Sequence, residues 1–301
     1  MSRLLTLTML AETLRIAMPY ACAAVAGVWS ERSGVVNIAL EGVLLSSALG
    51  AASATLATGS PTVGILGGLA VGIGVSCTHA LLVARYRVDA IVSGLALNIL
   101  AASGTRFVLR ALYDSSSNSP SFAGFHFGPT GSSGAALLAR VLLDPVTLLV
   151  LVAIGLTPWV LSRTRFGLRV RAVGENPVAA ASVGIPVTRV RMLALAVSGA
   201  IGALGGIHLA FDQHRFESGM SGGRGFIALA AVIVSGWRAV GAATACLVFA
   251  VLEATQIVLQ DQKTIPHEVV QMLPYLATVI LLGALAGRSR APAGLGKHAT
   301  D

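Results

Sequence analysis

Three polar side chains interrupt long apolar stretches in the first third of the chain. Asn37 and Glu41 are four residues apart, so on a helix they would share one face. In a bilayer each would cost a few kcal/mol unless it is paired or faces water. Two interpretations are open: a polar patch on a solute path, or a short turn whose Glu31 and Arg32 are solvated. Asn98, within another apolar stretch, either bonds a neighbouring helix or faces the same path.

A second interruption lies in the other half of the chain and is rich in glycine. Residues 219–236 read GMSGGRGFIALAAVIVSG. Paired glycine-interrupted segments in the two halves of a transporter point to its central site. The alternative interpretation is close packing of helices through glycine.

The loop 163–190 carries the third feature, a short apolar helix in basic surroundings. Six arginines fall between positions 163 and 191, against one acid. Within the loop, Pro177 suits a first helical turn, Asn176 suits its cap, and Gly184 suits its end. Such a helix has nothing in its own chain to bury against, which indicates docking to a partner protein. The alternative is a helix that lies on anionic lipid.

The composition defines the surroundings of these residues. Of 301 residues, 55% are hydrophobic and 11% are charged, and the mean hydropathy is +0.80. Ordinary soluble domains carry about 25% charged residues, so this chain has too few to solvate a surface of its size. We therefore predict an all-α fold, a polytopic transmembrane helical bundle in a single domain over 1–301. A soluble enzyme domain and a nucleic-acid-binding module are excluded.

A spanning helix needs about 20 mostly apolar residues. Eight stretches qualify, while a further segment, 224–237, is too short to span comfortably and is predicted to be a half-helix or re-entrant. The eight predicted spans are 7–29, two within 42–84, 89–112, 145–162, 192–211, 239–259 and 269–287.

Basic residues indicate the orientation, because Lys and Arg are enriched in cytoplasmic loops. They gather at 85–87, in the loop 163–190 and at 288–297, and they alternate with weakly acidic loops such as the outer loop 113–144. This pattern places the C-terminus in the cytoplasm. The side of the N-terminus depends on whether 224–237 crosses the membrane or re-enters.

The sequence has no recognisable motif for catalysis or for ATP binding. The phosphate loop G-x-x-x-x-G-K-[ST] does not occur, so ATP-driven transport would need a second chain to hydrolyse ATP. The histidines are scattered, and we expect no catalytic residue, metal site or cofactor in this chain. A transporter driven by ions or protons is the alternative, and Glu41 and Glu253 are the only acids well placed for it.

Six motifs occur along the chain in a fixed order. They are ERSGVVNIALEG (31–42), VSGLALNILA (92–101), GENPVAAASVGIPVTRVR (174–191), SGAIGALGG (198–206), GGRGFIALAAVIVSGW (222–237) and GRSRAPAGLGK (287–297). In this order they resemble the permease subunits of bacterial ABC importers for nucleosides and simple sugars, relatives of the branched-chain amino-acid permeases. The last motif and the fifth resemble the shorter of two permeases that pair as a heterodimer.

The resemblance implies roles for particular residues. Asn37, Glu41 and Asn98 would line the translocation path. The helix of the 163–190 loop would be the coupling helix that sits in a groove of the ATPase, through residues that match its motif: Gly174, Glu175, Asn176, Pro177 and Gly184.

The resemblance also implies the protein's partners and location. The partners would be a second permease, a cytoplasmic ATP-binding subunit, an extracytoplasmic solute-binding protein and the lipid bilayer. The location would be the bacterial plasma membrane, and nucleosides are favoured over simple sugars. One departure from the family is the charged stretch 211–220 (FDQHRFESGM), which could alter docking of the binding protein.

Overall fold

The computed structural model describes residues 7–125, 131, 133–260, 272, 276–277, 279–280, 283 and 289–297. These residues form helices and one isolated β-bridge, which confirms the predicted all-α bundle. Seven helices are long and apolar enough to cross a membrane: α1 (Leu7–Arg32), α2 (Leu40–Thr58), α3 (Pro61–Ala80) with its continuation η2 (Leu81–Arg85), α4 (Ala90–Tyr113), α6 (Pro145–Arg163), α9 (Val187–Asp212) and α11 (Ala239–Gln260). They match seven of the eight predicted spans, and the eighth, 269–287, lies largely outside the described residues.

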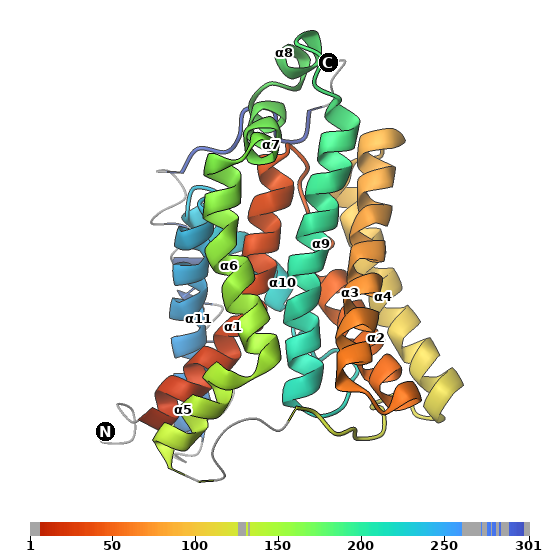
Figure 1. The fold of residues 1–301 in the computed structure, drawn as a ribbon, viewed down its shortest axis with the longest axis vertical. Coiled ribbons are helices and arrows are strands. Elements are labelled where there is room, and N and C mark those ends of the chain that lie inside the picture. Colours follow the sequence, from red (N-terminus) through yellow and green to blue (C-terminus); the bar gives the residue numbers. More distant parts are fainter. Residues whose placement is uncertain are drawn as a thin grey trace.

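Two helices form the centre of the bundle. In the most apolar part of α1 and of α9, 72% of the residues are buried, against 28% in α4, α6 and α11. Figure 1 shows α1 and α9 side by side, with α6 and α11 on one flank and α2, α3 and α4 on the other. The outer helices therefore turn most of their apolar surface away from this chain, as helices in lipid or against a partner subunit do.

Glycines allow α9 to lie directly against α2 and α3. A Cβ atom added at Gly206 of α9 would lie 2.1 Å from the backbone oxygen of Leu44 in α2. One added at Gly199 would lie 2.5 Å from the Cβ of Ser76 in α3. Small residues permit this approach of backbones in membrane bundles, where water does not drive helices together. The motif 198–206 is thus a packing surface.

Four shorter helices lie at the ends of the bundle or inside it: α5 (Gly134–Leu143), α7 (Arg165–Glu175), α8 (Pro177–Ser182) and α10 (Arg224–Val234). α7 and α8 lie at one end together with residues 289–297, and we call this the basic end (top of Figure 1). α5 and the start of α1 lie at the opposite end. The two termini of the chain therefore mark opposite ends of the bundle.

Residues 213–238 cross the bundle in two pieces. After α9 ends opposite the basic end, residues 214–218 pair with 117–122, for example through Phe122 N–H to His214 O at 2.9 Å and Ser119 N–H to Phe216 O at 2.9 Å. α10 then continues to the basic end, where the Trp237 carbonyl accepts from Arg32 Nε at 2.9 Å. The segment 224–237 is thus a half-helix that completes a crossing, and it does not re-enter.

Candidate functional site

The helix that would join α1 to α2 is interrupted at residues 33–39, which we call the first broken segment. A backbone without helical bonds is tolerated at membrane depth only where other groups satisfy it. Side chains of α3 and α4 do so here: His79 Nε2 lies 3.0 Å from Val36 O, and Asn98 Nδ2 donates to Ile38 O at 2.9 Å. A carbonyl only accepts, so His79 carries its proton on Nε2, and Nδ1 accepts from Ser93 Oγ at 2.9 Å.

Both the nitrogen and the oxygen of the Asn98 side-chain amide form hydrogen bonds with the backbone of residues 38–42. Besides its bond to Ile38, its Oδ1 accepts from Gly42 N–H at 2.8 Å. Of the two options for Asn98, bonding a neighbouring helix is the one seen. The Asn98 side chain therefore joins α4 to the residues where α2 begins.

Asn37 is the least satisfied of the three polar side chains. It is fully buried, and its Nδ2 donates to Ser198 Oγ at 3.3 Å. Ser198 in turn donates to Ala26 O at 2.7 Å. Within the described part of the chain, Asn37 Oδ1 has no hydrogen-bond partner. An orphaned acceptor in apolar surroundings is costly, so Asn37 is the group with capacity left for a polar ligand or a rearranged state.

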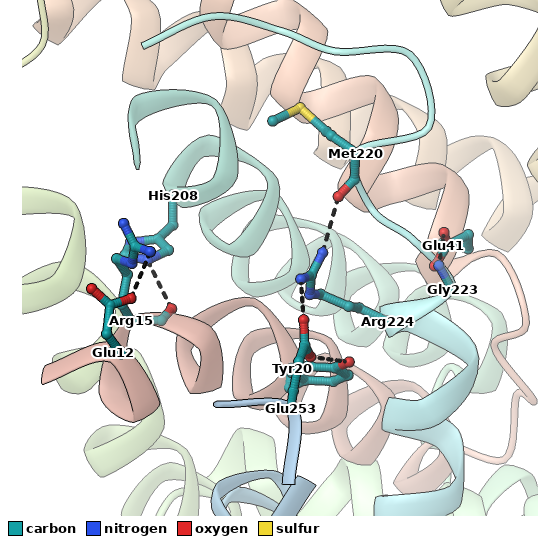
Figure 2. Close-up of polar contacts among 9 residues, drawn as sticks. All are labelled: Glu12, Arg15, Tyr20, Glu41, His208, Met220, Gly223, Arg224 and Glu253. Atoms are coloured by element: carbon teal, nitrogen blue, oxygen red, sulfur yellow. Dashed lines mark hydrogen bonds and ion pairs between the residues drawn. The ribbon is translucent and has the colours of Figure 1, made fainter. Parts of the chain in front are cut away.

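Glu41 caps the N-terminus of α10. Its Oε1 accepts from Gly223 N–H at 2.8 Å (Figure 2) and from Ser221 Oγ at 2.6 Å, and its Oε2 accepts from Gly225 N–H at 2.8 Å. A carboxylate is favoured there, because the first N–H groups of a helix are unpaired and carry partial positive charge. Position 225 requires glycine, since a Cβ atom would lie 2.5 Å from the nitrogen of Glu41. The end of the first broken segment and the second broken segment, residues 213–223, thus meet beside this carboxylate.

Glu31 and Arg32 hold the other end of α10. Glu31 is 5% exposed and accepts a hydrogen bond from the indole N–H of Trp237, while Arg32 bonds the carbonyl of the same tryptophan. The interpretation of this stretch as a solvated turn is wrong for Glu31, which is buried and bonds to Trp237. Trp237 is 6% exposed and lies inside the bundle.

A buried ion pair lies beside the start of α10. Arg224 Nη2 lies 2.6 Å from Glu253 Oε1 of α11, and both side chains are less than one-fifth exposed. Tyr20 of α1 donates to Glu253 Oε2 at 2.7 Å, and the Arg224 guanidinium stands over its ring at 5.5 Å (Figure 2). Sequence reasoning considered Glu253 as an acid for ion coupling and missed this pair, although an arginine and a glutamate in two consecutive apolar runs were a usable signal.

The predicted coupling helix is present at the basic end as α8. Asn176 Oδ1 accepts from Ala179 N–H at 3.0 Å, Pro177 occupies the first turn, and Gly184 has the left-handed φ of +81° that ends the helix. Val178 and Val183 are 47% and 75% exposed. The expectation that this helix has nothing to bury against was wrong in part, because Pro177 and Ala180 are buried in its own chain.

Gly174 and Glu175 lie where α7 turns into α8. A Cβ atom at Gly174 would lie 2.1 Å from Arg32 O, so the corner rests directly on the end of α1. Glu175 Oε2 accepts from Ala293 N–H at 3.3 Å. The residues predicted for coupling and the residues predicted for the path therefore occupy two regions, which the first broken segment connects.

Charges of the unusual stretch 211–220 are paired at the opposite end. Asp212 lies 3.4 Å from Arg15, which also bonds Glu12 at 2.6 Å, and Arg215 pairs with Glu217 at 2.5 Å. His208 lies close to this group, its Nε2 3.2 Å from Arg15 O (Figure 2). The departure from the expected pattern thus forms a charged surface at the end away from α8.

Fold and site together define a polytopic membrane protein with two broken crossings that meet at buried polar groups, the arrangement of a transport path. The chain belongs to the family described as branched-chain amino acid transport system / permease component, which matches residues 9–282.

Relatives carry more specific names. The chain is 34% identical over 294 residues to the guanosine ABC transporter permease protein NupQ of Bacillus subtilis (93% of this chain, 92% of NupQ). It is 34% identical over 296 residues to the nucleoside ABC transporter permease protein NupC of Lactococcus lactis (94% and 93%). It is 32% identical over 235 residues to the putative glucose ABC transporter permease protein TsgC13 of Haloferax volcanii (76% and 70%).

Proposed function

We propose that this chain is the shorter permease subunit of an ATP-driven importer and that its substrates are nucleosides. The observation that carries the proposal is its 34% identity, over more than nine-tenths of its length, to two permeases named for guanosine and nucleosides. The match to a permease named for glucose is shorter. Simple sugars are therefore the second substrate class to test.

The path follows the two broken segments. Asn37 offers a free amide oxygen, and hydroxyl or amino groups of a nucleoside are the donors that it would accept. Glu41 and Asn98 position this region through their bonds to α10 and to residues 38–42. High affinity belongs to an external binding protein in this proposal, so the permease needs only a weakly polar passage.

The ends of the bundle receive different partners. The basic end faces the cytoplasm by the positive-inside rule, and the C-terminus lies there. An ATP-binding subunit docks on α8, whose exposed Val178 and Val183 supply an apolar contact. The charged end around Arg15 and Arg215 faces outward and receives the solute-binding protein.

A second permease covers part of the apolar surface of this chain. α4 turns large side chains outward, among them Phe107 at 74% and Ile99 at 68% exposure. The path then lies between the two permeases. They rock around it when ATP binding draws the ATPases together.

The experiment begins with a tagged chain expressed with its neighbouring genes in a bacterial host. Stoichiometric recovery of a second permease and an ATP-binding subunit, followed by ATP-dependent uptake of guanosine in proteoliposomes, is the expected result. Labelled glucose and ribose form the comparison arm. A chain that purifies alone and transports without ATP, with loss of transport on adding an uncoupler, would refute the proposal in favour of ion coupling.

Coupling is tested by Asn176→Ala, which removes the cap of α8. We expect lower uptake and weaker stimulation of ATP hydrolysis at unchanged expression, because an N-cap contributes about 1 kcal/mol to its helix. Ser182→Ala, at the exposed end of the same helix, is the matched control. Wild-type coupling in Asn176→Ala would count against a role for α8.

A further inference from the structure

Residues 291–297 form a strap across the basic end that bonds two distant parts of the chain. Gly294 N–H donates to Gly174 O at 2.8 Å, at the corner between α7 and α8. Two residues later Gly296 N–H donates to Gly34 O at 2.9 Å, at the start of the first broken segment. The strap therefore touches both the predicted coupling region and the segment that leads to Asn37 and Glu41.

Arg191, in the second turn of α9, bonds both the strap and the start of the first broken segment. Its Nε donates to Ser33 O at 3.2 Å and its Nη2 donates to Lys297 O at 2.6 Å. Arg191 is 3% exposed, and its bond to Ser33 O is buried. The planar guanidinium can bond two carbonyls at once in a fixed geometry, which an ammonium group cannot reproduce.

Three glycines make the junction too close for side chains. A Cβ atom at Gly294 would lie 2.8 Å from Gly174 O and 2.8 Å from Pro177 Cδ. One at Gly34 would lie 3.1 Å from Gly294 O, in addition to the strain of its positive φ. Backbone thus rests on backbone between the strap, the α7–α8 corner and the end of α1. Packed interfaces of this kind move as units and do not deform continuously.

Between this junction and the start of α10, hydrogen bonds from neighbouring helices hold the chain. Val36, Ile38 and Gly42 are bonded to α3 and α4 through His79 and Asn98. Glu41 then holds the start of α10. Glu41 lies seven positions after Gly34, the residue that the strap contacts.

We infer that the strap is a positioning element that joins α8 to the first broken segment, so that a displacement of α8 moves Asn37 and Glu41 with it. This inference rests on the proposed function, in which α8 receives the motion of an ATPase. Gly294 and Arg191 are the positioning residues. Their loss separates ATP hydrolysis from transport, because hydrolysis belongs to another chain while the path loses its connection to α8.

The test measures solute transported per ATP hydrolysed by the complete complex in proteoliposomes. For Gly294→Ala we expect this ratio to fall about fivefold or more, the size of a typical coupling free energy between sites. ATP hydrolysis itself should persist. Ala291→Ser, at an exposed position of the strap, is the control and should keep the wild-type ratio.

A second variant tests whether the effect of Gly294→Ala comes only from a local packing defect. Arg191→Lys retains the charge but bonds only one of the two carbonyls, so it should lower the same ratio while the ATP-binding subunit still copurifies. Wild-type ratios in both variants would overturn the inference. Failure of both variants to assemble would also overturn it, since the strap would then serve folding. A failure of the proposed function can be told apart from a failure of this inference, because in that case the wild-type complex itself would lack ATP-dependent uptake.

Discussion

Glu31 and Glu41 bind opposite ends of the same half-helix. Glu41 accepts the N–H groups of Gly223 and Gly225 at the start of α10, and Glu31 accepts the indole N–H of Trp237 just beyond its end. α10 has 11 residues and is about 16 Å long, roughly half the thickness of the hydrocarbon core of a bilayer. Two acids ten positions apart in the first motif therefore fix where a late segment of the chain lies.

Glu41→Gln should weaken the start of α10. The amide retains one acceptor oxygen, but its NH₂ group opposes an N–H donor of Gly223 or Gly225. Hydrogen bonds to charged groups contribute about 1.5–3 kcal/mol, so we expect a lower unfolding temperature of the purified complex and slower uptake. Glu12→Gln, at a half-exposed ion pair, is the control for stability and should leave the unfolding temperature nearly unchanged. Wild-type stability of Glu41→Gln would show that the cap is dispensable.

Asn98→Asp separates the two bonds of the amide. The carboxylate still accepts from Gly42 N–H, but it repels Ile38 O, where the amide had donated. We expect a loss of about 1–3 kcal/mol in stability, the cost of an unsatisfied buried polar group. The measurement is the unfolding temperature with and without substrate. An unchanged unfolding temperature would mean that other contacts hold residues 38–42 in place.

The pair Arg224–Glu253 calls for a double-mutant cycle. Arg224→Met leaves the partly buried Glu253 carboxylate with the Tyr20 hydroxyl but without its cation, and should cost about 1.5–3 kcal/mol, the contribution of a hydrogen bond to a charged group. Arg224→Met with Glu253→Met should recover much of that stability, because neither charge is then buried alone. Retained transport in the double variant would assign the pair a structural role. Loss of transport at recovered stability would place it in the transport cycle.

Gly206→Ala tests the contact of α9 with α2. A methyl group there would meet the backbone of Leu44, so we expect poor assembly or a strongly lowered unfolding temperature. Gly155→Ala in α6 is the matched control, because its added methyl group meets no atom within 4 Å. Equal stability of the two variants would mean that α9 and α2 are free to separate.

Sequence reasoning found the elements and missed most of their contacts. Apolar run length predicted the spans, and Asn176, Pro177 and Gly184 predicted α8 correctly, because caps and turns are local properties of the chain. The crossing of 213–238 was not predictable from length, since its first part, 213–223, is not helical and some of its bonds go to residues 117–122. Periodicity records no such long-range pairing.

The interpretation of single polar residues failed for the same reason. Glu31 looked like a solvated turn residue, because its partner Trp237 is 206 positions away. His79 seemed one of several scattered histidines, yet it holds the carbonyl of Val36. The path roles of Asn37, Glu41 and Asn98 stay predictions.

The bond between Glu41 and Gly223 has a consequence for biosynthesis. The two residues are separated by 182 positions in the sequence. At translation rates of about 5–20 residues per second, Glu41 leaves the ribosome about ten to forty seconds before its partner exists. During that interval the nascent membrane helix carries a bare carboxylate, so early insertion has to rely on the translocon, on water or on a chaperone to shelter it.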